Sequence, residues 1–186
     1  MTNVFPFDLS KAIQALGILH DEENDAKVST YRLLKLLYIS DRKYLKATGR
    51  PIVGGRDVAM RRGPLSSNAY DLVKGEHPDA NRFLKFFRKY GRLLEKISDP
   101  GRDELSKREI RMLVDTSCDY KLFDDDEIGE LSHSYAEYQK HYVKDTSTTI
   151  TLDSKLEALD IVDKRESILK DIQETLALKQ ILESVG

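Results

Sequence analysis

The fold is decided by residues 33–75, which read LLKLLYISDRKYLKATGRPIVGGRDVAMRRGPLSSNAYDLVKG. Apolar residues in the first part of this stretch recur at steps of three and four, which is typical of an amphipathic helix. We predict that the helix begins at Ser29, whose side chain can cap it while Val28 packs against Leu33. Gly49 is expected to end the helix, because glycine readily adopts the left-handed conformation that follows a last helical turn.

A β-hairpin is predicted directly after this helix, over residues 51–60. Pro51 prevents the helix from resuming, and the glycine pair at 54–55 can adopt the positive φ that a two-residue turn requires. Two short strands alone are only marginally stable, so we expect them to pack against the preceding helix. Residues 61–64 then turn the chain into a short helix that closes at Gly75.

Asp41 is the unusual residue of the first of these helices, because it falls between Leu37 and Leu45 on the apolar face. A buried carboxylate is costly unless it is hydrogen-bonded or paired with a positive charge. We therefore expect Asp41 to bind either backbone N–H groups or an arginine of the hairpin that follows. This interpretation gives the carboxylate a structural role and not a catalytic one.

The fold class that these patterns predict is mainly α. We expect a compact multi-helix domain with one small β-hairpin inserted after the second helix, followed by a C-terminal helical segment. Cap residues and apolar spacing indicate where the other helices lie. They are predicted over residues 8–20 and 79–90, from the capping box Ser106–Glu109, and from the acidic run 124–126.

We place the domain at residues 1–143, and a linker with a C-terminal amphipathic helical segment at 144–186. Residues 144–151 read as a linker or a short extended piece. The polar run 163–167 interrupts the helical spacing that follows and is expected to divide it into two helices. Either these helices pack back on the domain, or they form an arm that pairs with a second copy or grips a partner protein. Membrane binding is not expected, because the segment is net acidic.

The composition of the 186 residues, 40% hydrophobic and 33% charged, is that of a water-soluble globular protein. No secretory signal is visible, and no apolar run approaches the ~20 residues that cross a bilayer. A single cysteine fits a reducing compartment. We therefore predict a cytoplasmic location. Residues 31–111 carry 20 Lys/Arg against 10 Asp/Glu, whereas residues 112–186 carry 8 against 17. Either the two regions neutralise each other, or one of them steers a charged partner.

No set of residues predicts catalysis, a metal site or a cofactor. Glu130, His133, Glu137 and His141 could share one helical face, but a di-iron site of this type needs a second Glu-x-x-His half, and the chain offers none. The close glycines fit turns and not a phosphate-binding loop. We therefore predict that the protein is not an enzyme and uses no cofactor.

The motifs in this stretch resemble the Panacea (SocA-like) antitoxin domain in order and spacing. That pattern has a leucine-rich helix ending in Asp-Arg, then Gly-Arg-Pro, a glycine-containing hairpin, a Val-Ala strand, Gly-Pro, Ser and Tyr-Asp-Leu. The matching residues here are Leu36-Leu37-Tyr38, Asp41-Arg42, Gly49-Arg50-Pro51, Gly54, Val58-Ala59-Met60, Gly63-Pro64, Ser66 or Ser67, and Tyr70-Asp71-Leu72. The family often has Gly-Asp where this chain has Gly54-Gly55. The structural signature is thus Asp41, Gly49, Pro51, Gly54, Gly63 and Pro64.

The resemblance implies an antitoxin of a bacterial, phage or prophage toxin–antitoxin pair, which neutralises a cognate toxin by direct protein–protein binding. It also implies a second mode, in which the antitoxin acts as an adaptor that delivers the toxin to a protease, so a protease or chaperone is a further expected partner. Arg56, Arg61, Arg62 and Tyr70 are the candidate partner-binding residues. The alternative is a nucleic-acid-binding regulatory protein that contacts DNA through the basic middle, although the net acidity counts against it. Homo-oligomer formation stays open.

Overall fold

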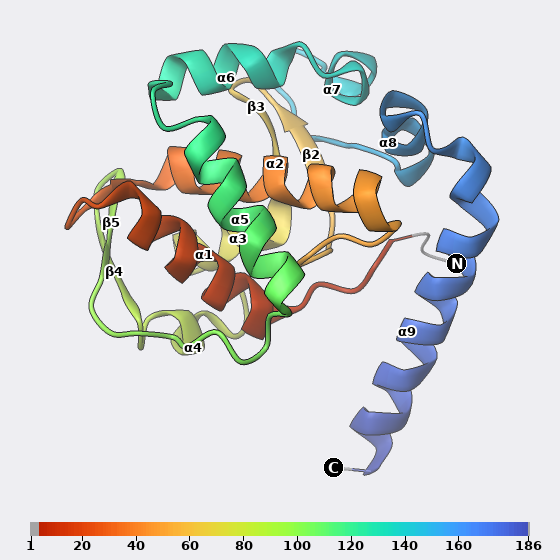
Figure 1. Ribbon diagram of the computed structural model, residues 1–186, viewed down its shortest axis with the longest axis horizontal. Coiled ribbons are helices and arrows are strands. Elements are labelled where there is room, and N and C mark those ends of the chain that lie inside the picture. Colours follow the sequence, from red (N-terminus) through yellow and green to blue (C-terminus); the bar gives the residue numbers. More distant parts are fainter. Residues whose placement is uncertain (1–3, 186) are drawn as a thin grey trace.

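The computed structural model describes residues 4–185 and is mainly helical, with two small antiparallel sheets (Figure 1). The elements in chain order are α1 (Leu9–Glu23), β1 (Val28–Ser29), α2 (Thr30–Thr48), β2 (Asp57–Met60), β3 (Gly63–Ser66), α3 (Ser67–Lys74), α4 (Ala80–Phe83), β4 (Phe87–Tyr90), β5 (Leu93–Lys96), α5 (Lys107–Asp119), α6 (Asp125–His133), α7 (Ala136–His141), β6 (Thr148–Thr149), α8 (Leu152–Leu159), the 3-10 turn η1 (Val162–Lys164) and α9 (Arg165–Val185). Within residues 4–185, every helix is too short or too polar to cross a lipid bilayer.

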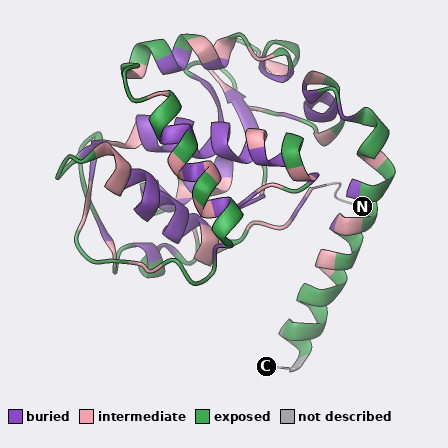
Figure 2. Ribbon diagram, viewed as in Figure 1, coloured by how far each residue is buried: buried purple, intermediate pink, exposed green. Residues whose placement is uncertain are grey.

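The centre of the fold is α2, which α1, α5 and β3 cover and which Figure 2 shows as mostly buried. Its predicted ends are confirmed, since the Ser29 side chain accepts a hydrogen bond from the backbone N–H of Arg32 and Gly49 adopts φ +80°. Val28 and Leu33 both lie in the main core, as the predicted packing at the helix start requires. Three other predicted helix starts are confirmed by side-chain caps, at Asp8, Ser106 and Asp124.

The β-hairpin that follows α2 lies further along the chain than the sequence predicted. Strand β2 pairs with β3, with Val58 opposite Leu65, so Arg61 and Arg62 form the turn. The expected hairpin over residues 51–60 is therefore wrong. Residues 52–54 donate their backbone N–H groups to a side chain of α2, which makes these groups unavailable to a strand partner.

The predicted helix over residues 79–90 is also wrong. Only α4 is helical there, and the chain continues into the hairpin β4–β5. Phe83 and Phe87 are four residues apart, a spacing that suits one helical face, and both are buried. They stack with their ring centroids 4.6 Å apart, but one belongs to a helix and the other to a strand. Strand β5 gains β1 as a second partner, with Val28 opposite Leu94, so pairing with a distant segment outweighs the local helical pattern.

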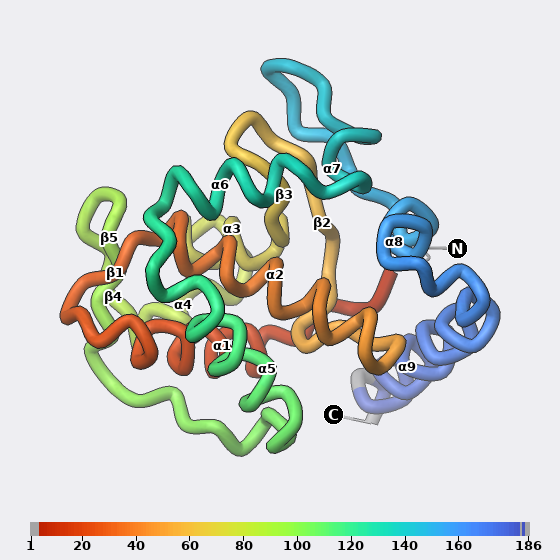
Figure 3. The backbone as a smooth tube through the Cα atoms, turned by 45° about the horizontal axis from the view of Figure 1, so that its top comes forward, coloured from red at the N-terminus to blue at the C-terminus, as the bar shows by residue number. Residues whose placement is uncertain are grey.

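Instead of the one predicted hairpin, the described residues form two sheets, with strand orders β1-β5-β4 and β3-β2-β6. Strand β6 comes from residues 144–151, the segment expected to be a linker or a short extended piece. It adds to the free edge of β2, with Val58 opposite Thr149. The β4–β5 hairpin and the α8–α9 segment lie at opposite ends of α2 in both Figure 1 and Figure 3.

The C-terminal helices pack back on the domain through their first half. A second apolar cluster joins Phe5 and Leu45 to side chains of α8 and α9, ending with Ile172 and the half-buried Leu176. The turn η1 separates the two helices at the predicted polar interruption. The last part of α9 lies at the edge of the molecule (Figures 1 and 3) and exposes Leu178, Ile181 and Leu182.

Candidate functional site

The carboxylate of Asp41 organises the loop between α2 and β2. Its Oδ1 atom accepts hydrogen bonds from the backbone N–H groups of Ile52 at 2.9 Å and Val53 at 3.1 Å. Its Oδ2 atom accepts one from Gly54 at 3.3 Å. Of the two kinds of partner expected from the sequence, backbone N–H groups bind this carboxylate, and an arginine does not.

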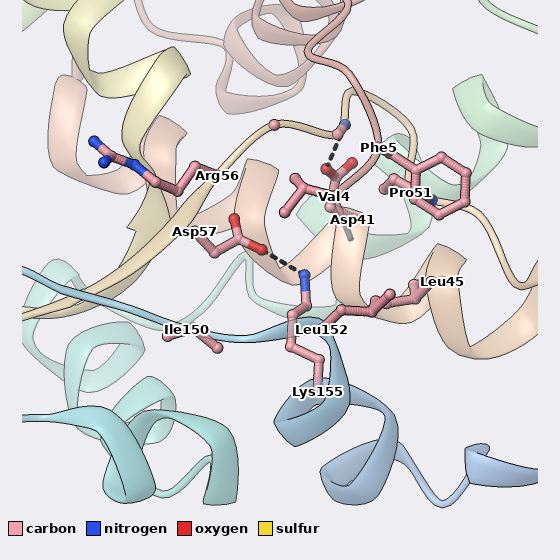
Figure 4. A pocket seen from close by; sticks show the side chains of 12 residues that line it. Val4, Phe5, Asp41, Leu45, Pro51, Arg56, Asp57, Ile150, Leu152 and Lys155 are labelled. Carbon is pink, nitrogen blue, oxygen red and sulfur yellow. Dashed lines mark hydrogen bonds and ion pairs between the residues drawn. The ribbon is translucent and has the colours of Figure 1, made fainter. Parts of the chain in front are cut away.

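Burial raises the pKa of Asp41 to about 7, although Lys155 and the backbone N–H groups act in the opposite direction. The Lys155 ammonium lies 2.5 Å from the Asp57 carboxylate, as Figure 4 shows. Burial alone would lower the pKa of Lys155, but the contact with Asp57 outweighs it and the pKa is raised. These groups border a cavity of only about 40 Å³, which is room for water and not for a substrate.

The buried charges continue along α2 into a second ion pair. Arg42 donates from Nε to Glu137 at 2.6 Å, and Tyr38 donates its hydroxyl to the same carboxylate oxygen at 3.1 Å. Glu137 is fully buried, so this pair would be costly without its hydrogen bonds. Together with the Asp57–Lys155 contact it attaches α7 and α8 to the centre of the fold.

Two signature glycines lie where a side chain would not fit. A Cβ atom on Gly54, which has φ +66°, would come within 2.7 Å of the Pro6 carbonyl oxygen. A Cβ atom on Gly63, at φ +97°, would lie 2.5 Å from both the Lys35 Nζ and the Ser132 Oγ atoms. These signature positions let the N-terminal segment and α6 approach the backbone of the loop and hairpin.

The buried Lys35 side chain of α2 binds the β2–β3 hairpin. Its ammonium group donates to the carbonyl oxygen of Pro64, a signature residue, at 2.7 Å. Burial, together with the nearby charge of Arg62, lowers the pKa of Lys35 to about 7. The sequence reasoning missed Lys35 and Lys155, although a lysine inside the run LLKLL was a signal that one charge would be buried.

Three of the four candidate partner-binding residues border one groove. Arg61, Arg62 and Tyr70 line a groove with a volume of about 560 Å³ between the β2–β3 turn, α3 and the β4–β5 hairpin. Arg56 does not belong to this groove, because it lies beside the Asp41 cavity and donates to the hydroxyl of Ser67 at 3.0 Å. The structure therefore divides the predicted set into a groove and a separate loop position.

The histidines and acids near the end of the domain do not converge. Glu137 binds Arg42, and His141 Nε2 lies 2.9 Å from the Ser154 hydroxyl. His133 lies 3.7 Å from Glu130, and its buried Nε2 atom has no partner among the described residues. In residues 4–185, no group of three or more His, Cys, Asp or Glu side chains is arranged to hold a metal ion.

Comparison with known protein families gives a match to the middle of the chain. The sequence model of the family "Antitoxin SocA-like, Panacea domain" matches residues 33–139, from α2 to α7. The matched range contains the Asp41 loop, the two hairpins and α3, whereas Ser29, Thr30 and Tyr31 of the groove precede it. No curated protein and no solved structure matches the chain.

Proposed function

Because the chain belongs to the SocA-like Panacea antitoxin family, we propose that it is an antitoxin that neutralises a cognate toxin by direct protein–protein binding. The match over residues 33–139 is the observation that carries this proposal. The toxin would be encoded next to the antitoxin, in a bacterial or phage genome. The antitoxin would act without chemistry of its own, by covering the surface that the toxin uses.

The arrangement of the molecule supports binding over catalysis. The most unusual ionisable groups, Asp41, Asp57 and Lys155, are bound to one another or to backbone groups and border only a water-sized cavity. The larger groove instead carries exposed arginines beside half-buried tyrosines, residue types that are enriched in protein–protein interfaces. Delivery of the bound toxin to a protease would be a second step that starts from the same complex.

Co-expression tests the proposal directly. The chain is produced together with the product of its neighbouring gene, and growth rescue and co-purification are measured. We expect growth to be restored and the two proteins to purify as a complex. Growth arrest without a complex would overturn the proposal.

A regulatory protein that binds nucleic acid is the second candidate, which the basic rim of the groove favours. Its affinity for a DNA duplex would fall steeply with salt, because binding to phosphates releases counterions. A mobility-shift titration at two salt concentrations distinguishes this candidate from the antitoxin.

A further inference from the structure

The groove between the two hairpins combines an apolar floor with a basic rim. Buried side chains of Leu34, Leu65 and Val73 line its floor. Leu93, which is 40% exposed, continues this apolar surface onto the β4–β5 hairpin. A ligand that fills the groove would therefore bury apolar side chains of its own against this floor.

The rim carries positive charge that the described part of the chain does not neutralise. Arg61, Lys89 and Arg92 are exposed, and within residues 4–185 no acidic group pairs with their side chains. Arg62 also lacks an acidic partner there and instead covers the Tyr31 ring at 4.0 Å. Asp125 is the one acidic residue that borders the groove in the described structure, and it binds the Ser29 hydroxyl.

The aromatic rings of the groove are poorly placed to stack on nucleic-acid bases. Arg62 covers the ring of Tyr31, and the Tyr31 hydroxyl donates to the Arg62 carbonyl oxygen at 2.9 Å. Lys74 lies 5.1 Å from the centre of the Tyr70 ring. Proteins that bind single strands need exposed ring faces for the bases. Covered ring faces therefore favour a protein segment over a single-stranded nucleic acid as the occupant of the groove.

We propose that this groove binds an acidic segment of the partner protein, with apolar side chains on the floor and Asp or Glu residues against the rim cations. The inference rests on the proposed function and specifies the chemistry of the toxin surface that is recognised. Rim charges accelerate association and select the partner, while the desolvated floor supplies the affinity.

The test uses the purified chain and the product of the neighbouring gene. In the groove variant, Arg61→Glu, Lys89→Glu and Arg92→Glu are combined, because these side chains are exposed and form no ion pair within residues 4–185. The matched control combines Lys46→Glu, Lys107→Glu and Lys144→Glu, which make the same change in net charge at exposed positions away from the groove. Circular dichroism verifies that both variants keep the wild-type helix content and melting temperature.

We expect the groove variant to bind the toxin at least ten times more weakly than the wild type and to lose growth rescue, whereas the control changes Kd by less than twofold. Changing the acidic residues of the bound toxin segment to lysine should restore binding to the groove variant only. A milder set, Arg61→Ala with Lys89→Ala and Arg92→Ala, should weaken binding to a smaller extent and serves if the reversed charges impair folding.

Each contrary result has a distinct meaning. If the wild type binds and rescues and the groove variant does so equally well, the groove is not the recognition surface. If the wild type itself neither binds nor rescues, the antitoxin function fails, and the inference fails with it. If the groove variant keeps toxin binding but loses binding to a 20-base-pair DNA duplex, the groove is a nucleic-acid site instead.

Discussion

Replacing Asp41 by asparagine should change how the stability of the protein depends on pH. Asparagine imitates the protonated acid, because its carbonyl oxygen can keep the bonds from Ile52 and Val53. Burial raises the pKa of Asp41 from 3.8 to about 7 in the folded protein. The folded state therefore favours the protonated acid. The wild type loses stability as the pH rises from 3.8, the pKa of Asp41 in the unfolded chain, through about 7, its pKa in the folded protein.

The size of the effect follows from this difference in pKa. One pKa unit corresponds to about 1.4 kcal/mol, so the full loss across the window is about 4 kcal/mol. Between pH 5 and pH 8 the free energy of unfolding of the wild type, relative to Asp41→Asn, should fall by about 2–3 kcal/mol. The variant should thus be the more stable protein at pH 8.

Urea unfolding followed by circular dichroism at 222 nm measures this difference at pH 5, 6, 7 and 8. The exposed substitution Asp163→Asn controls for the loss of one negative charge. Asp41→Ala, which removes every acceptor, should cost about 1–3 kcal/mol at pH 5, because buried N–H groups are left unpaired. A constant difference between wild type and Asp41→Asn from pH 5 to pH 8 would refute the reasoning. It would mean that the backbone N–H groups and Lys155 keep the carboxylate ionised throughout.

Three further substitutions test the buried charges and the glycine at the hairpin. Burial lowers the pKa of Lys35 to about 7, so the wild type should gain stability relative to Lys35→Met as the pH rises from 7 to 10. Urea titrations should show a gain of up to about 4 kcal/mol in the free energy of unfolding. A loss of stability over this pH range would contradict the assignment. Gly63→Ala should lower the free energy of unfolding by more than Gly75→Ala, which serves as the control. A Cβ atom at Gly75 meets nothing within 4 Å, so only the backbone strain of about 1–2 kcal/mol remains there. Lys155→Met should cost about 3–5 kcal/mol by leaving the Asp57 charge buried and unpaired, and adding Asp57→Asn should recover part of this loss in a double-mutant cycle; strictly additive losses would argue against the pair.

Local patterns predicted the features that depend on neighbours in sequence. The ends of α2 follow from Ser29 and Gly49, because a cap bonds to backbone groups only three or four residues away. The burial of Asp41 could be inferred because its apolar neighbours are one helical turn away. Its N–H partners, at positions 52–54, lie close enough in the chain to be among the expected alternatives.

Long-range pairing explains what these patterns missed. The segment 79–90 has helical spacing, yet β4 forms there because β5 and the distant β1 complete a sheet. The Asp57–Lys155 contact joins residues 98 positions apart, and the burial of the Lys155 charge becomes visible only once α8 packs on the hairpin. The groove likewise needs two hairpins and α3 to come together. Helix caps and apolar periodicity involve residues only a few positions apart, so the local sequence is enough to predict the helices that they define. Burial, pKa and concave surfaces instead depend on which distant segments exclude water from one another, and only the folded chain determines this.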